Sequence, residues 1–350
     1  MSDGRRGLGP IALALAIGAA GGYVANQIDL PLAWMIGAML FVTVAALARL
    51  PVALPPRLRA VMIALLGVML GSAFTPDLLG RAGDWWITLS ALLVYSAVVG
   101  GACFVLFRRW AGYDRPTAYF AAMPGGLLEM TLLAQENGGD DRVVALVHTA
   151  RVMLIVLTIP FWFRMVEGYD AARRTAEDLS LVDAPLAEMA ILALIGYAGA
   201  VGARIVRLPA TYLIGPMVAS AIAHLLGWTT FRPPAELVTL AQVVVGAAIG
   251  CRFAGIAVMQ VLRTLGHAAG ATAIMLAGTI VASALLHQAV DAPTPALVLA
   301  FAPGGLAEMS LVALALATDA AFVSTHHVVR IAYVVVVAPF VYRMLRKLQR

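Results

Sequence analysis

Long apolar segments alternate with short polar ones along the whole chain of 350 residues. Most of the apolar segments approach the roughly 20 residues that an α-helix needs to cross a bilayer. In the first half these segments cover residues 10–27, 32–49, 58–75, 85–107, 115–135 and 142–165. In the second half they cover residues 187–204, 211–228, 235–253, 264–287, 293–317 and 321–342. The pattern predicts an all-α polytopic membrane protein.

The first apolar segment has two interpretations. Arg5 and Arg6, followed by an apolar run and the small residues 19–22, resemble a cleaved signal peptide. Its counterpart in the second half, residues 189–203, is internal and cannot be a signal. We therefore expect the first segment to be retained as a membrane span.

Composition supports a membrane protein and narrows the possible partners. Hydrophobic residues make up 62% of the chain and charged residues 12%, whereas soluble domains carry about 25% charged residues. The net charge is +5, but the cations lie mostly at segment ends, where they set membrane orientation. The basic balance therefore does not predict nucleic-acid binding. We expect the lipid bilayer to be the main surroundings of the chain.

A seven-residue motif occurs twice. Pro124–Met130 reads PGGLLEM and Pro303–Met309 reads PGGLAEM, so six of seven positions agree. The spacing between the two copies also relates further pairs: Asp140 and Asp319, His148 and His327, Arg151 and Arg330, Pro160 and Pro339. Two copies with this long a period indicate a duplication, as in many transporters. We predict a first repeat at 1–166, a polar linker at 167–186 and a second repeat at 187–350.

The Pro-Gly-Gly segments decide the topology. If each one crosses the bilayer, each repeat has six spans and the repeats are parallel. If each one dips in and returns, each repeat has five spans and the repeats are inverted. Proline and two glycines discourage one continuous helix, which favours two re-entrant or broken helices, about ten transmembrane helices and an inverted arrangement. The distribution of Lys and Arg does not separate the alternatives.

Few charged groups fall well inside the apolar segments. Among 19 acidic residues only Glu129 and Glu308 do so, and among 24 basic residues only Arg151 and Arg330. Ionisable groups at such positions are costly and point to function. Glu129 with Arg151 and Glu308 with Arg330 are natural partners, and pairing across the repeats is equally compatible with the sequence.

These groups define a candidate substrate-binding site. A half-helix that starts after each glycine pair directs the positive end of its dipole at the break, which suits an anion such as a carboxylate. The two glutamates can then take up protons or hold a coupled cation. The candidate residues are Pro124, Gly125, Gly126, Glu129, His148, Arg151, Pro303, Gly304, Gly305, Glu308, His327 and Arg330.

A purely structural interpretation stays open beside the functional one. Each glutamate can cap the N-terminus of its own helix, and a buried Glu–Arg pair can fix helix register. We predict that Glu129→Gln and Glu308→Gln remove activity while the protein still inserts and folds, whereas unchanged activity in both variants would favour the capping interpretation. His326 has no counterpart in the first half and is interpreted as a packing residue.

The duplicated Pro-Gly-Gly-x-x-Glu-Met and His-x-x-Arg motifs, the latter followed by Pro-Phe, resemble the AbrB duplication family of bacterial inner-membrane proteins. The resemblance covers nearly the whole chain and implies a multi-pass protein of the bacterial inner (plasma) membrane. Members carry labels as regulators of gene expression or as ammonia monooxygenases. No copper or iron ligand set accompanies the motifs, and no soluble domain is available to read DNA. The layout is also similar to that of glutamate and 2-hydroxycarboxylate symporters, as architecture only.

We therefore expect a secondary transporter that moves a small organic anion or metabolite through a site between the two repeats. The alternative is a membrane-embedded sensor that influences gene expression indirectly. We expect no enzymatic activity, no cofactor, no metal site and no direct contact with nucleic acid. The expected partner is a small-molecule substrate, with a coupling proton or cation and a homo-oligomeric state as open options.

Overall fold

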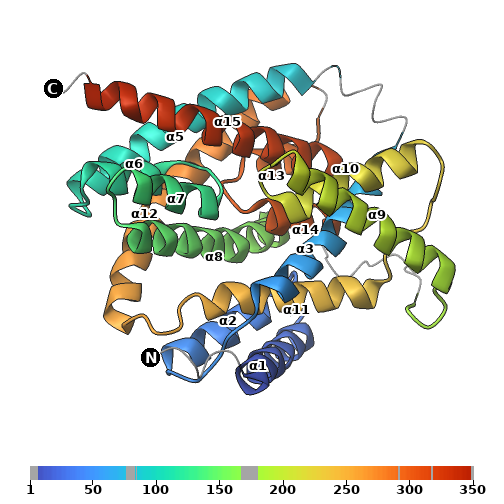
Figure 1. Ribbon diagram of the computed structural model, residues 1–350. Coiled ribbons are helices and arrows are strands. Elements are labelled where there is room, and N and C mark those ends of the chain that lie inside the picture. Colours follow the sequence, from blue (N-terminus) through green and yellow to red (C-terminus); the bar gives the residue numbers. More distant parts are fainter. Residues whose placement is uncertain are drawn as a thin grey trace. The chain divides into compact units, whose positions relative to one another are not determined.

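The computed structural model describes residues 7–75, 83, 85–166, 180–290, 292–316 and 318–347. All regular secondary structure in these ranges is helical, which confirms the predicted all-α class (Figure 1). The predicted linker at 167–186 lies largely outside the described residues. Its described part, residues 180–185, leads into the next helix.

The helices follow the predicted apolar segments closely. In the first half they are α1 (Leu8–Gln27), α2 (Ala33–Leu47), α3 (Pro56–Gly71), α5 (Trp85–Arg109), α6 (Arg115–Ala122), α7 (Leu127–Glu136) and α8 (Asp141–Val166). In the second half they are α9 (Leu186–Ile205), α10 (Thr211–Leu225), α11 (Ala235–Cys251), α12 (Val258–His287), α13 (Thr294–Phe301), α14 (Leu306–Ala315) and α15 (Ala320–Lys347). Both Pro-Gly-Gly segments are broken into two short helices, as their composition predicts.

Several helices have the length and composition of membrane spans. Within the described ranges, six helices are long and apolar enough to cross a bilayer: α1, α5, α8, α9, α12 and α15. Shorter apolar helices of 10–17 residues include α2, α10 and α11. The chain is therefore a multi-pass membrane protein. The expected total of about ten spans stays a prediction.

The chain forms two compact units, and each unit takes helices from both halves of the sequence. Unit 1 comprises the described residues within Met1–Gly80, Leu157–Ala257 and Ser310–Ala321. Unit 2 comprises those within Arg81–Val156, Val258–Met309 and Phe322–Arg350. Both Pro-Gly-Gly motifs, from Pro124 and from Pro303, fall in unit 2.

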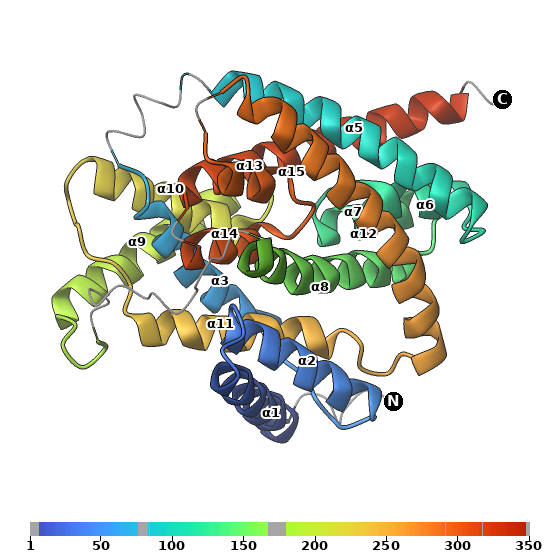
Figure 2. The ribbon, with the colours of Figure 1, turned by 180° about the vertical axis from the view of Figure 1, so that it is seen from behind.

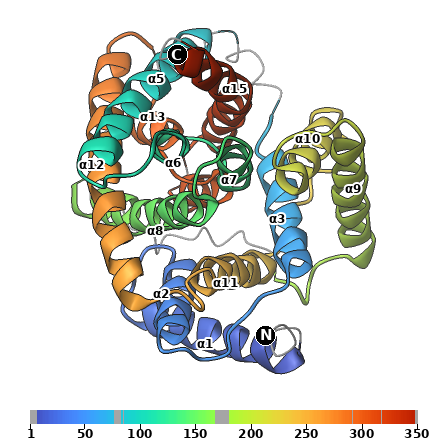
Figure 3. The same cartoon turned by 60° about the vertical axis from the view of Figure 1, so that its left-hand side comes forward.

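Unit 1 contains two groups of three helices. In one group α2 packs against α1 and α11 (Figure 2), and in the other α10 packs against α9 and α3 (Figure 3). Glycines permit the close approach of the backbones. A Cβ atom at Gly37 would meet the backbone of Gly21, and a Cβ atom at Gly215 would meet the backbone of Gly199. The two contacts occupy equivalent positions in the two halves of the chain.

The third helix of each group comes from the other half of the chain. Gly246 of α11 lies against the carbonyl oxygen of Met35 on α2. Gly67 of α3 lies against the carbonyl oxygen of Leu213 on α10. The halves therefore exchange equivalent helices, and neither half forms unit 1 by itself.

In unit 2, α5 packs along α12 and α6, and α12 also contacts α13. The Tyr95 hydroxyl joins two of these helices, because it donates to the Met275 carbonyl oxygen at 3.0 Å and lies 2.9 Å from Thr279 Oγ1. The Phe301 ring packs on Tyr95 with ring centroids 5.4 Å apart. Unit 2 thereby surrounds the end of α13, where the second break begins.

Candidate functional site

The two helix breaks of unit 2 have the same local construction. In the first, α6 ends at Ala122 and α7 begins at Leu127, with extended Gly126 as its N-cap. In the second, α13 ends at Phe301 and α14 begins at Leu306. Proline lacks an N–H group and disfavours a helical conformation at the residue before it, so each helix ends there. We refer to residues 123–126 and 302–305 as break 1 and break 2.

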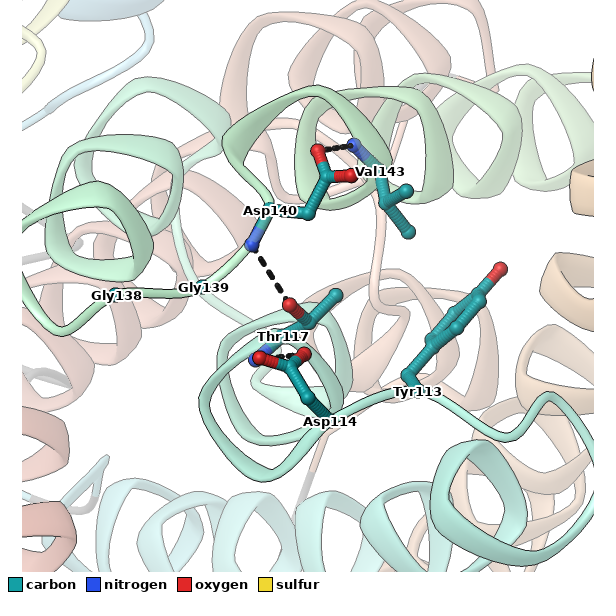
Figure 4. A pocket seen from close by; sticks show the side chains of 7 residues that line it. All are labelled: Tyr113, Asp114, Thr117, Gly138, Gly139, Asp140 and Val143. Carbon is teal, nitrogen blue, oxygen red and sulfur yellow. Dashed lines mark hydrogen bonds between the residues drawn. The ribbon is translucent and has the colours of Figure 1, made fainter.

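The chain turns back on itself at break 1. The Thr117 hydroxyl oxygen near the start of α6 accepts a hydrogen bond of 2.7 Å from the Asp140 N–H, which follows α7 (Figure 4). With 8 and 10 residues, α6 and α7 are about 12 and 15 Å long at 1.5 Å per residue. Each therefore reaches about half of the roughly 30 Å apolar core of a bilayer. This is the geometry of a re-entrant hairpin.

An open hollow of about 520 Å³ lies where the two ends of this hairpin meet. Its lining includes Tyr113, Asp114, Thr117 and Asp140 (Figure 4). The carboxylates act within the fold: Asp114 accepts from the Thr117 N–H at 3.3 Å, and Asp140 accepts from the Val143 N–H at 3.1 Å. The hollow thus marks the capped starts of α6 and α8.

Arg151 holds break 1 through backbone oxygen atoms. Its Nη1 donates to the Met123 carbonyl oxygen at 3.0 Å, and its Nη2 donates to the Gly125 carbonyl oxygen at 3.3 Å. The last carbonyl groups of a helix have no partner within it, and a cation near them is favourable. The guanidinium therefore stabilises the C-terminal end of α6, although the side chain is only 3% exposed.

Arg330 repeats this arrangement at break 2. Its Nη1 donates to the Ala302 carbonyl oxygen at 2.6 Å, and its Nη2 donates to the Gly304 carbonyl oxygen at 2.9 Å. The side chain is 2% exposed. Each donor and each acceptor is the counterpart, in the duplicated sequence, of the one at break 1. The predicted arginines thus lie at the predicted breaks, in equivalent geometry.

The predicted histidines complete each arrangement. His148 Nε2 lies 2.9 Å from the Phe120 carbonyl oxygen, and His148 Nδ1 lies 3.0 Å from Arg151 Nη2. A carbonyl oxygen only accepts and a guanidinium only donates, so Nε2 carries the proton and Nδ1 accepts. His327 makes the same contacts with Leu299 and Arg330 at 2.9 and 2.8 Å. Each ring is therefore neutral and orients its arginine.

The predicted ion pairs are not formed. No ion pair joins Glu129 to Arg151 or Glu308 to Arg330 in the described part of the chain, because each guanidinium binds carbonyl groups and histidine instead. Residue spacing predicts which side chains share one face of a helix. It does not predict which groups of another helix or loop these side chains contact. The pairing inferred from the sequence is therefore wrong for this structure.

Both glutamates lie over the N-cap glycine of the following half-helix. A Cβ atom at Gly126 would overlap Glu129 Oε2, and a Cβ atom at Gly305 would overlap Glu308 Oε2. A carboxylate at the third helical position stabilises the positive end of the helix. This position agrees with the capping interpretation. The two sites differ in burial, since Glu129 is half-buried whereas Glu308 is 5% exposed.

Two buried cations share unit 2. Arg151 and Arg330 interact electrostatically with each other and with Tyr95. Among the described residues, the Nε atom of each arginine is buried without a hydrogen-bond partner. Each guanidinium thus keeps positive charge and donor capacity that its backbone contacts do not use.

Tyr95 and Thr279 were missed by the sequence reasoning. Thr279 Oγ1 lies 3.4 Å from the Phe301 carbonyl oxygen, at the end of α13. The sequence did contain one indication of Tyr95, which lies in the middle of a 25-residue apolar helix. Tyrosine in membrane spans prefers the interfaces, so a tyrosine at mid-span is unusual. Together these residues place hydroxyl groups beside break 2, near the two cations.

Comparison with known proteins gives a match over most of the chain. A sequence model of the family described as "Transition state regulatory protein AbrB" matches residues 34–346. The Bacillus subtilis (strain 168) protein named "Uncharacterized protein YhjN" is 29% identical, with 95% of this chain and 92% of that protein covered. The Escherichia coli (strain K12) protein named "Putative regulator AbrB" is 26% identical, with 91% of each chain covered.

Proposed function

The chain belongs to the AbrB family, and we propose that it is a secondary transporter of the bacterial inner membrane that moves a small organic anion. The observation that carries this proposal is the pair of arginine-held helix breaks in unit 2. Broken helices near the middle of the membrane are the usual construction of substrate sites in transporters.

The electrostatics of unit 2 favour an anionic substrate. Arg151 and Arg330 are buried, interact with each other and, within the described residues, form no ion pair with Glu129 or Glu308. Two neighbouring cations in a medium of low dielectric repel each other, and an anion near both relieves that cost. An organic carboxylate matches this field.

The hairpin at break 1 supports inverted repeats. If break 2 also lies in a re-entrant segment, each half crosses the bilayer five times and the halves are inserted in opposite senses. Equivalent contacts such as Gly37 with Gly21 and Gly215 with Gly199 then follow from one pseudo-two-fold axis. Inverted repeats permit alternating access, because each half can take up the conformation of the other.

The test is counterflow in proteoliposomes that contain the purified protein. Vesicles are loaded with one unlabelled compound at a time (pyruvate, succinate, citrate or glutamate), with glucose and choline as neutral and cationic controls. A trace of the labelled compound is added outside. We expect transient accumulation of at least one anion above protein-free vesicles, and none of glucose or choline.

A second function is suggested by the name of the Escherichia coli relative, a regulator. A membrane-embedded sensor would bind its anion at the same breaks without moving it. Anion-dependent stabilisation of the detergent-solubilised protein, together with no counterflow of that anion, would favour the sensor and contradict the transporter.

A further inference from the structure

The histidines at the two breaks are not available as proton carriers. His148 and His327 each accept a hydrogen bond from arginine on Nδ1, so protonation of that nitrogen would break the contact that orients the guanidinium. His326 differs from both. It is fully buried in unit 2, and the equivalent position in the first half is Val147.

Three hydrogen-bond contacts define the surroundings of His326. Nδ1 lies 2.8 Å from the Phe322 carbonyl oxygen, and Nε2 lies 2.8 Å from Thr88 Oγ1. Thr88 Oγ1 in turn lies 2.9 Å from the Trp85 carbonyl oxygen. Carbonyl oxygens only accept, so Nδ1 carries a proton.

The neutral and the protonated state of His326 differ in the number of protons available for these three contacts. A neutral imidazole and a hydroxyl group supply two protons for three contacts, so one contact has no proton. An imidazolium and a hydroxyl group supply three. With the ring protonated, Nε2–H donates to Thr88 Oγ1 and the Thr88 hydroxyl donates to the Trp85 carbonyl oxygen. The neutral ring satisfies both contacts of His326 but leaves the contact between Thr88 and Trp85 without a proton, and only the protonated state supplies a proton to all three contacts.

His326 lies close to the proposed anion site at break 2. On α15 it precedes Arg330 by four residues, so the two share a helix face. Its ring lies 6.4 Å from the ring of Phe301, the last residue of α13 before break 2. The charged and titratable groups that act on it in the described structure are Arg330 and His327.

The remaining contacts around His326 are uncharged. Helix α5 presents Trp85 and Thr88 to the ring, and the Phe322 ring lies 4.0 Å from it. A proton on His326 is opposed first by the burial of the ring and then by the charge of Arg330. An anion bound near Arg330 offsets this repulsion, so anion binding and protonation favour each other. Linkage makes the coupling reciprocal.

We propose that His326, hydrogen-bonded to Thr88, binds the proton that moves together with the anion. The proposal rests on the proposed transporter function and names its coupling ion. One proton from water binds to Nε2 as the anion arrives, and the Thr88 hydroxyl turns from Nε2 to the Trp85 carbonyl oxygen. When the anion leaves on the other side, Nε2 returns the proton to water and the hydroxyl turns back.

The experiment compares two modes of transport by the same vesicles. Counterflow at equal internal and external pH requires no net proton movement, whereas accumulation driven by an acidic exterior does. The anion is the member of the pyruvate, succinate, citrate and glutamate panel that gives counterflow. We expect His326→Gln to lower driven accumulation about tenfold more than it lowers counterflow, a difference of about 1.4 kcal/mol in coupling.

Matched controls separate the proton site from loss of a side chain. His287→Gln makes the same substitution at an exposed histidine on α12, and Ser96→Ala removes a buried hydroxyl from α5, as Thr88→Val does. Both controls are expected to retain coupling. Thr88→Val is expected to reduce it, because imidazolium Nε2–H then has no acceptor. Driven accumulation that falls no further than counterflow in His326→Gln would overturn the proposal.

A direct measurement on the wild-type protein does not depend on how the variants fold. The anion is added to the detergent-solubilised protein in weakly buffered solution with a pH indicator. We expect uptake of up to one proton per chain, because reciprocal linkage makes anion binding favour protonation. Anion exchange without proton uptake would overturn the proton site and leave the transporter standing. Absence of counterflow for every anion would instead reject the transporter itself.

Discussion

At the residue scale, the Pro-Gly-Gly-x-x-Glu motif and the His-x-x-Arg motif are two parts of one construction. Arginine and histidine hold the carbonyl groups at the end of the first half-helix, and glutamate lies over the start of the second. A cation therefore stabilises the negative end of one helix dipole and an anion the positive end of the next. The side chains of the two motifs therefore stabilise the two helix ends at each break and, in the residue ranges that the structure describes, do not form an ion pair with each other.

The N-cap glycine at break 2 leaves room for the glutamate. In Gly305→Ala the new Cβ overlaps Glu308 Oε2 and must displace the carboxylate. We expect the variant to lose about 1–3 kcal/mol of stability, measured by thermal unfolding in detergent. The loss should largely disappear in a Glu308→Ala background. An equal loss in both backgrounds would contradict the proposed contact.

Gly101→Ala is the control for this substitution, because no atom lies within 4 Å of a Cβ built at Gly101 in α5. Alanine favours a helix over glycine by up to about 1 kcal/mol, so stability should be unchanged or slightly higher. A large loss at Gly101 would mean that the measurement reports damage to any helix.

Glu308 is expected to act through its position rather than through its charge in the transport reaction. Glutamine can also occupy this position of a capping box, so Glu308→Gln should retain most of the counterflow. Glu308→Ala should lose about 0.3–2 kcal/mol of stability, the range for a carboxylate near a helix N-terminus. If Glu308→Gln unfolds at the wild-type temperature but shows no counterflow, the carboxylate itself takes part in transport and the capping interpretation is contradicted.

At the element scale, the helices were predictable from the sequence and their partners were not. Apolar runs set the bounds of α1 and α5, and proline with paired glycine set the breaks near Pro124 and Pro303, because these signals act locally. The packing of α2 on α11 and of α10 on α3 depends on contacts between opposite halves of the chain. Periodicity cannot reveal such contacts.

The exchanged helices depend on equivalent glycines, which gives a paired prediction. Gly246→Ala places a Cβ atom against the Met35 carbonyl oxygen, and Gly67→Ala does so at Leu213. Backbone cannot move away as a flexible side chain can, so each variant should lose about 1–3 kcal/mol in thermal unfolding. Gly202→Ala, with no atom within 4 Å of the Cβ, is the control. A loss at only one of the two glycines would contradict their equivalence.

At the scale of the whole molecule, the site residues were predictable but the arrangement that joins them was not. His148, Arg151, His327 and Arg330 were identified because they repeat and because charge is costly in an apolar segment. The inferred Glu–Arg pairing was wrong, because the arginines bind backbone carbonyl groups at the broken helices. Every residue has such a group, so the sequence does not show which ones are left without a partner. The capping interpretation was available and agrees with the geometry.

The hairpin geometry makes a prediction about topology. Because the Asp140 N–H donates to Thr117, the segment after α7 should lie on the same side of the membrane as the end of α5. Single cysteines at the exposed residues Trp110 and Glu136, in a protein lacking Cys103 and Cys251, should react with a membrane-impermeant maleimide from the same side. Reaction from opposite sides would mean that residues 115–136 span the bilayer.

In the proposed transporter the anion is bound at the two breaks whose carbonyl groups Arg151 and Arg330 hold. Counterflow of the transported anion by Arg151→Lys and Arg330→Lys, measured beside wild type, tests this directly. Lysine keeps the charge but cannot hold two carbonyl groups and a histidine in one plane, so we expect each variant to lose about tenfold or more in rate.

Arg343→Lys makes the same substitution at an exposed position of α15 and serves as the control in that measurement. Its counterflow is expected to stay close to the wild-type rate. Wild-type counterflow in both Arg151→Lys and Arg330→Lys would contradict anion binding at the two breaks.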